Sequence, residues 1–258
     1  MIFEPSWAVI AACSLICCMA ATLVGFSGFG FALIAVPLLS MILDLKFVVP
    51  LALLMAFFCV AVLSANKLRF FKERALIITM GIVYLGMMVG IELGTRALAE
   101  FDTAILKRVL GAVVILFALH MFLRVRREEN GPPRSGLKRL LGMLVAFLVG
   151  ICSGIGGGLF GTSGPPLVVY VDHFAENKSA FRAHLLMLFV LHDTFRLYRY
   201  GHHSLLNMEM VRFGLWLLPA VCVGLFVGSK LHSLVSEKTF NRSVACMLFV
   251  SGLLLLKP

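Results

Sequence analysis

Apolar residues are grouped along the chain in long runs that are separated by short charged segments. The runs fall at residues 7–43, 47–65, 75–93, 105–123, 140–171, 183–200, 211–229 and 241–256. Most have close to the roughly 20 residues that an α-helix needs to cross a bilayer. The pattern therefore predicts an all-α, polytopic membrane helix bundle.

Two of the runs are too long for a single crossing. Charged residues are absent from Pro5 to Leu43 and from Leu140 to Val171. As single helices these runs would be roughly 58 and 48 Å long, against a hydrocarbon core of roughly 30 Å. We expect each run to break and turn back at its glycines, in "GFSGFGF" (Gly25–Phe31) and in "SGIGGG" (Ser153–Gly158).

A polar segment divides the chain almost in half. Its mixed charges and Gly-Pro-Pro, at residues 124–139, are typical of a solvated linker. Similar patterns occur in the same order on either side of it. The pairs are Ser27-Gly28-x-Gly30 with Ser153-Gly154-x-Gly156, Val36–Leu39 with Pro165–Val168, and the ladder Gly86/Gly90/Gly94 with Ala220/Gly224/Gly228. We expect two homologous halves, 1–123 and 140–258, each with a Gly/Pro-broken helix.

Positive charge predicts how these segments are oriented. The linker and Asn66–Arg74 contain the densest clusters of Lys and Arg, which belong on the cytoplasmic side of a membrane. If each long run forms a hairpin, each half has five segments and the halves are inverted repeats. Four crossings per half, which would make parallel repeats, are the alternative. We expect a multi-pass protein of the inner (cytoplasmic) membrane.

Composition agrees with a membrane protein and narrows the function classes. The chain is 60% hydrophobic and 14% charged, whereas soluble domains are about 45–50% apolar and about 25% charged. Its net charge of +10 lies in short loops, so the positive-inside rule explains it and we expect no nucleic-acid partner. Because nucleotide-binding and metal-ligand motifs are absent from the sequence, we expect no cofactor, no metal and secondary transport.

The stretch "SGIGGGLFGTSGPPLVVY" (Ser153–Tyr170) resembles the TauE/SafE family. A weaker Gly/Pro copy in the first run, the basic linker and an arginine after the second motif, Arg182, share the resemblance, which covers essentially the whole chain. It implies a multi-pass membrane protein that exports or otherwise transports sulfite and organosulfonates. Arg182 matches an arginine that is common in the family.

The glycines have a physical role beside this resemblance. Irregular backbone at membrane depth is stable only inside protein or along a wet cavity. Glycine lets backbone approach a ligand closely, and free N–H groups at a helix N-terminus favour an anion. Close helix packing is the alternative role, and it is the one we expect for the two small-residue ladders. The predicted substrate contacts are Gly28, Gly30, Gly154, Gly156, Gly157, Gly158, Gly161, Gly164 and Pro165.

The sixth run contains ionisable residues, which are costly in a membrane and usually functional. Arg182, Asp193 and Arg196 fall on one face of a helix, and Asp193 and Arg196 are three residues apart and able to pair. We expect all three to bind substrate, with Asn66 at the end of the second run as a further candidate. Snorkelling toward the membrane surface is the alternative for the two arginines.

Together these features predict a secondary transporter, and not an enzyme, that exports small sulfur-containing anions such as sulfite or organosulfonates. A carboxylate permease is an alternative, because N–H groups and an arginine distinguish sulfonates from carboxylates poorly. An intramembrane enzyme built on His192–Asp193 and a non-transporting scaffold are further alternatives. The expected partners are the anion, membrane lipid and a second copy, since a homodimer is the commonest closed assembly.

Overall fold

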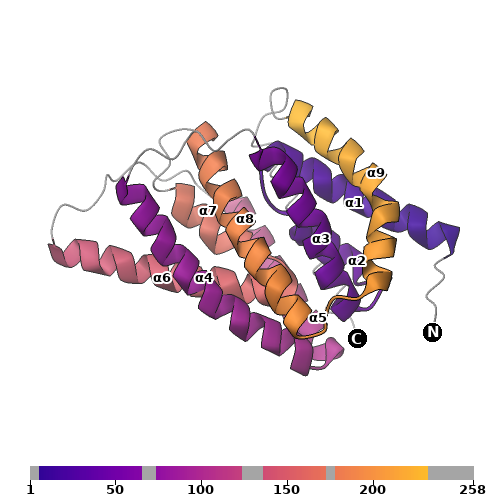
Figure 1. Cartoon of the computed structure of the whole chain (residues 1–258), viewed down its shortest axis with the longest axis horizontal. Coiled ribbons are helices and arrows are strands. Elements are labelled where there is room, and N and C mark those ends of the chain that lie inside the picture. The colour runs from indigo at the N-terminus through magenta and orange to yellow at the C-terminus, as the bar shows by residue number, and fades with distance from the viewer. Residues whose placement is uncertain (1–5, 66–73, 124–135, 173–177, 232–258) are drawn as a thin grey trace.

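The computed structural model describes residues 6–65, 74–123, 136–172 and 178–231, and these residues form helices and short connections without strands (Figure 1). The all-α prediction is therefore confirmed for this part of the chain. The apolar run at 241–256 lies outside the described residues. The helices are α1 (Trp7–Ser27), α2 (Phe31–Leu39), α3 (Leu45–Ser64), α4 (Arg74–Glu100), α5 (Thr103–Leu123), α6 (Gly136–Phe160), α7 (Gly164–Asp172), α8 (Lys178–His202) and α9 (Met208–Leu231).

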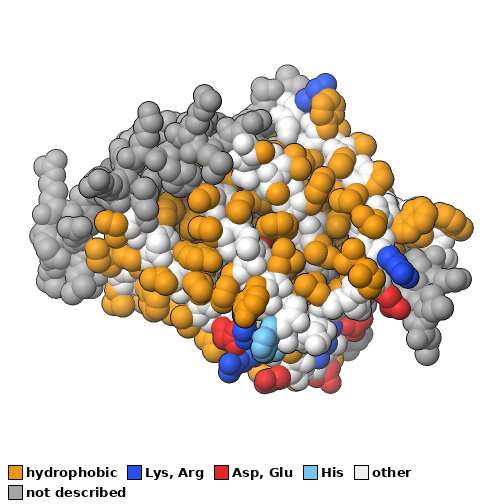
Figure 2. Space-filling model, viewed as in Figure 1, with side chains coloured by type: hydrophobic (Ala, Val, Ile, Leu, Met, Phe, Trp, Pro, Cys, Tyr) orange, Lys and Arg blue, Asp and Glu red, His pale blue; other side chains and the backbone are white. Residues whose placement is uncertain are grey.

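Five of the described helices are long and apolar enough to cross a membrane. They are α1, α3, residues 78–100 of α4, residues 142–160 of α6, and α9, with mean hydropathies between 1.5 and 2.7. Figure 2 shows apolar side chains spread over the visible face of the molecule, with charged side chains gathered near its edges. Such a face suits lipid. The protein is a multi-pass membrane protein.

The first long run is divided into two helices at Gly28–Gly30. Gly28 and Gly30 have φ angles of 87° and 95°, a left-handed conformation that favours glycine. The amide of Gly28 donates to the Val24 carbonyl and ends α1, and the chain turns into α2 at Phe31. The Ser27 hydroxyl lies 2.8 Å from the Leu23 carbonyl and 2.9 Å from the Phe29 carbonyl.

The second long run is divided later than predicted. Residues 153–158 are helical, because α6 continues to Phe160, so the predicted position of this break was wrong. The chain leaves the helix at Gly161, whose φ is 76°, and α7 begins at Gly164. The physical reason is packing. A β-carbon on Gly154 would lie 2.9 Å from the Gly90 Cα, so the glycines that disfavour a free helix allow α6 to contact α4 closely.

The two small-residue ladders pack helices together, as predicted. The glycines of the α4 ladder face the backbone of α6, where a β-carbon on Gly90 would collide with the Ile151 carbonyl. In the same way, β-carbons on Gly224 and Gly228 of α9 would collide with carbonyls of α1, at Cys18 and Thr22. The pairs α4–α6 and α1–α9 are the most extensive helix contacts in the described structure (Figure 1). The interrupted helix α1 therefore packs on the ladder helix α9, and α6 packs on the ladder helix α4.

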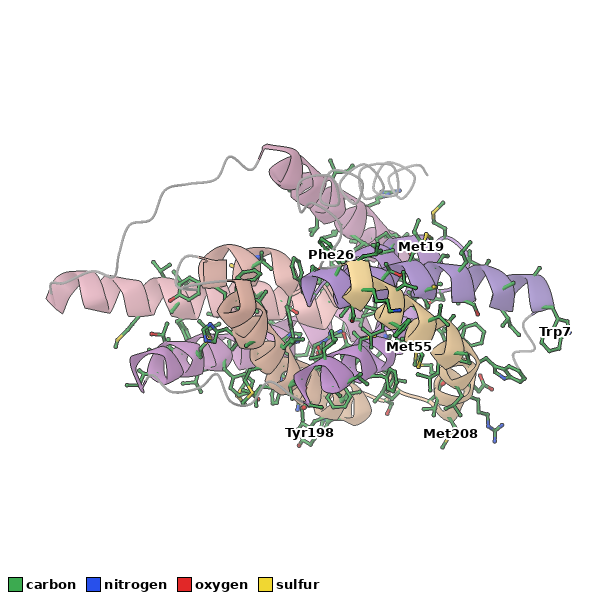
Figure 3. The ribbon with its side chains drawn as sticks, turned by 90° about the horizontal axis from the view of Figure 1, so that it is seen from above. Trp7, Met19, Phe26, Met55, Tyr198 and Met208 are labelled. Carbon is green, nitrogen blue, oxygen red and sulfur yellow. The ribbon has the colours of Figure 1, made fainter. Side chains whose placement is uncertain are left out.

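The interruption after α1 lies in the interior of the molecule. Figure 3 shows Trp7 at the outer end of α1 and Phe26, near its other end, close to the middle. Phe26, Phe31 and Phe160, beside the two interruptions, are all buried. Helices α3 and α8 pack against each other, and α3 also packs on α2. The fold thus brings both interruptions and α8 to one central region.

Candidate functional site

A cavity lies between the two interruptions. Its volume of about 40 Å³ exceeds the roughly 10–15 Å³ that one water molecule needs. Gly30 lines it from the first interruption, Gly161–Gly164 from the second, and Asp193 and Arg196 from α8. The remaining wall is apolar and includes Phe31, Leu53, Ala56, Val60 and Phe189. The cavity lining therefore combines polar groups with apolar side chains.

Arg196 is the buried cation of this cavity, with 1% of its surface exposed. Its Nη1 donates to Asp193 Oδ1 over 3.4 Å, and its Nη2 donates to the Tyr200 hydroxyl over 3.0 Å. The guanidinium carbon also lies 5.1 Å from the centre of the Tyr200 ring. Its Nε is buried without a hydrogen-bond partner. A buried guanidinium with an unused donor is costly, and ionisable groups retained inside a membrane protein are usually functional.

Asp193 connects Arg196 to a buried histidine. Its Oδ1 lies 2.9 Å from His192 Nδ1, and because a carboxylate only accepts, this nitrogen carries the hydrogen. Ser163 Oγ lies 3.5 Å from the same nitrogen. The other ring nitrogen, Nε2, is buried without a hydrogen-bond partner. Serine, histidine, aspartate and arginine thus form one connected group beside the cavity.

Contacts with α6 and with the second interruption hold this group in place. The Tyr200 hydroxyl donates to the Gly158 carbonyl over 2.5 Å, near the end of α6. A β-carbon on Gly157 would collide with His192 Nε2, and one on Gly161 would lie 3.4 Å from Arg196 Nη2. The missing side chain at Gly157 therefore makes room for the imidazole, whereas the close contact of a β-carbon at Gly161 would be with the Ala32 Cβ, 2.9 Å away.

The structure separates the predicted site residues into two groups by position. Gly154 and Gly158 face α4, where they allow helix packing, and a β-carbon on Gly156 would lie 3.0 Å from the Thr162 carbonyl. Gly28 ends α1 within the first interruption, and Gly157 faces His192. These glycines are not among the cavity-lining residues. The predicted residues that do line the cavity are Gly30, Gly161, Gly164, Asp193 and Arg196.

Three further predictions fall where the structure gives no side chain. Arg182 lies in the first turns of α8 and Pro165 in the first turn of α7, but the side chains of both lie outside the described part of the chain. Asn66 lies outside the described residues altogether.

Sequence reasoning did not select Thr162, Ser163 or Tyr200. Thr162 and Ser163 form the second interruption, which the sequence analysis placed earlier in the chain. Tyr200 follows Arg196 by one helical turn, and this spacing is the signal that would have found it. The sequence pointed to His192 only as part of the enzyme alternative.

A second charged group lies near the end of α8. Glu92 of α4 pairs with Arg96 over 2.7 Å and with Arg199 of α8 over 2.5 Å. Arg199 also donates to His203 Nε2 over 3.2 Å. The side chains of Glu92 and Arg96 are 25% and 60% exposed, so this group is in contact with its surroundings and outside the cavity lining. It links α4 to α8.

Comparison with known proteins places the chain in a family. The model of the family described as sulfite exporter TauE/SafE matches residues 13–255, nearly the whole chain. Neither the curated proteins nor the solved structures contain a significant match. Proteins of this family are membrane transporters and not enzymes. With its membrane-spanning helices and its family match over almost the entire length, the chain belongs to the TauE/SafE family of sulfite exporters.

Proposed function

We propose that this protein is a secondary transporter of small sulfur-containing anions, such as sulfite or organosulfonates, in the inner membrane. The cavity between the two interruptions binds the anion, and export is the direction that the family suggests. The observation that carries the proposal is the buried guanidinium of Arg196, which lines this cavity and keeps one donor free.

The electrostatics of the cavity support an anion. A guanidinium presents donors in a planar fork that suits oxyanions. Helices α2 and α7 both begin at the cavity. Gly30 is the N-cap residue of α2, so no side chain of the cap bonds to the first N–H groups of this helix. Each helix N-terminus contributes about half a positive charge. Asp193 balances the positive charge of Arg196. The helix ends together then contribute about one positive charge, and with the unused Nε they favour binding of a monoanion.

The apolar residues of the cavity lining favour an anion that carries an organic group. Phe31, Leu53 and Phe189 line the cavity, and they have no donors or acceptors in their side chains. A small alkyl group placed against them removes apolar surface from water, which contributes about 25 cal/mol per Å². An organosulfonate offers a group to both the polar and the apolar lining residues, whereas sulfite offers one only to the polar residues.

The arrangement of the helices supports two inverted repeats that move around this cavity. α1 packs on α9 as α6 packs on α4, and α3 and α8 pack on each other. Gly28 and Gly161 both follow the last residue of an interrupted helix and both have positive φ. In this register Gly28 corresponds to Gly161 and not to Gly154. Rocking of one half, 1–123, against the other, 140–258, gives alternating access.

Arg196→Gln tests this function in purified protein and in proteoliposomes. Hydrogen bonds to charged groups contribute about 1.5–3 kcal/mol, so we expect the affinity for methanesulfonate to fall by about 10–150-fold. Arg196→Lys restores the charge without the fork and is expected to recover part of the affinity. Arg182→Gln measures whether Arg182, which the sequence predicted as a substrate contact, contributes to this affinity.

Two controls keep the test interpretable. Arg96→Gln makes the same change at an exposed arginine outside the cavity and is expected to bind as wild type does. Arg196→Gln combined with Asp193→Asn removes both buried charges, so lost affinity in this folded variant cannot reflect an unpaired aspartate. Wild-type affinity in both Arg196 variants contradicts the proposed site, and flux of carboxylates without sulfonates contradicts the proposed substrate.

A further inference from the structure

His192 has an unusual position for a histidine that serves only structure. It lies near the middle of α8 and is 0% exposed. Its Nδ1 donates to Asp193 over 2.9 Å, while Nε2 faces Gly157 and is buried without a hydrogen-bond partner. An asparagine would supply the same N–H to Asp193 without a buried, unpaired acceptor. The feature that histidine adds at this position is a second nitrogen that is able to hold a proton.

The charged side chains around the cavity balance each other while it is empty. Asp193 carries one negative charge and Arg196 one positive charge, and Oδ1 of Asp193 accepts from both Arg196 and His192. An anion that binds Arg196 adds a negative charge close to this carboxylate. The partial positive charges at the starts of α2 and α7 offset this charge only in part, because they are shared among backbone N–H groups, so a further full positive charge near Asp193 favours the bound anion. One proton on the neutral imidazole supplies it.

We propose that His192, held by Asp193, is a proton-binding site that takes up one proton when an anion binds at Arg196, so that proton and anion are carried together. The inference rests on the proposed function and adds the coupling ion and its site. A hydronium ion gives up the proton and becomes water, and the imidazole becomes an imidazolium paired with Asp193. The proton returns to water when the anion leaves, and no bond of the anion is made or broken.

The surrounding groups leave His192 as the proton acceptor. Arg196 and Ser163 are the other polar groups that contact the pair, and an arginine does not titrate in proteins. Glu92 of α4 is already held by two arginines, and Tyr84 of α4 donates to the Leu191 carbonyl. The other titratable groups with described side chains on α8 and on the helices around it are His184, Tyr198, Arg199, Tyr200, His202, Lys46, Cys59, Arg96, Glu100, Cys152 and Tyr170.

The coupling has two measurable consequences. By linkage, if the anion strengthens proton binding, the proton strengthens anion binding by the same factor, which is typically 5–150-fold. Anion affinity therefore falls by this factor as the pH rises through the titration of His192. Transport of a monoanion together with one proton moves no net charge across the membrane. Flux in either direction therefore responds to a pH difference and not to membrane potential.

Titration calorimetry of purified protein with methanesulfonate, in two buffers of different ionisation enthalpy, measures the protons taken up per anion. Methanesulfonate stays ionised, so it contributes no proton itself. We expect about one proton per anion for the wild type at a pH where the histidine is neutral in the empty protein. We expect His192→Asn to keep the bond to Asp193, to take up almost no proton and to lose the pH dependence of affinity. His184→Asn makes the same change at another buried histidine of α8 and is expected to keep the uptake.

The outcomes separate this inference from the proposed function. Methanesulfonate binding without proton uptake in the wild type overturns the inference and leaves the anion site intact. Full uptake in a folded His192→Asn variant, or its loss in His184→Asn, also overturns the assignment to His192. The wild-type measurement needs no variant, so poor folding of His192→Asn does not prevent the test. Absence of any anion binding overturns the proposed function and the inference together.

Discussion

Substitution of Gly157 by alanine tests whether the second glycine motif makes room for the buried histidine. Gly157 lies on α6 one turn before the second interruption. A β-carbon there would collide with His192 Nε2 and lie 2.7 Å from its Cε1 and 3.1 Å from the Ser163 Cβ. The imidazole is fully buried and bonded to Asp193, so the collision is relieved only if neighbouring groups shift or the ring gives up this bond.

The free energy of unfolding is expected to fall by about 0.5–2 kcal/mol, whether the site stays overpacked or the ring rotates away. Overpacking of a closed site costs about 1–3 kcal/mol. A rotation of the ring that relieves the collision breaks the hydrogen bond to the Asp193 carboxylate, which contributes about 1.5–3 kcal/mol. Against this, alanine is more favourable than glycine in a helix by about 1 kcal/mol. The loss therefore exceeds the gain.

Thermal unfolding in detergent measures this change, with Gly142→Ala as the matched control. A β-carbon on Gly142, in the same helix, meets nothing within 4 Å, so we expect this variant to be as stable as wild type or slightly more stable. His192→Asn in the Gly157→Ala background removes the colliding atom, and we expect it to recover about 0.5–3 kcal/mol relative to additivity. Gly157→Ala with wild-type stability, or a double variant whose effects simply add, would refute the reasoning.

Two further substitutions test the framework around the site. Gly90→Ala places a β-carbon against a backbone carbonyl of α6 and is expected to destabilise the protein by about 1–3 kcal/mol. Gly81→Ala is the control, because a β-carbon there meets nothing within 4 Å on the same helix, and we expect no destabilisation. Equal unfolding temperatures of the two variants contradict the close packing of α4 on α6. Tyr200→Phe removes the hydroxyl that bridges Arg196 and the Gly158 carbonyl, and we expect it to weaken methanesulfonate binding by about tenfold at unchanged pH dependence. Unchanged affinity means that Tyr200 does not position the guanidinium.

The sequence by itself determined the helices and much of their packing. A hydrocarbon core of fixed thickness sets the length of an apolar segment, so the runs correspond closely to α3, α4, α5, α8 and α9. Small residues at every fourth position fall on one face of a helix, so the ladders of α4 and α9 were recognisable as packing surfaces. The contact of Asp193 with Arg196 was also predictable, because residues three apart on a helix are neighbours.

Only the tertiary structure decided which glycines form the interruption and which residues meet around it. Residues 153–158 have the composition of a break, yet they stay helical because the glycines of α4 lie opposite them, and the chain turns at Gly161 instead. No local pattern shows that Gly30 lines the same cavity as Arg196, or that Tyr200 reaches the Gly158 carbonyl. Periodicity and length describe a helix relative to its own axis, whereas these contacts depend on how separate helices are placed, which is set by the packing of the whole bundle.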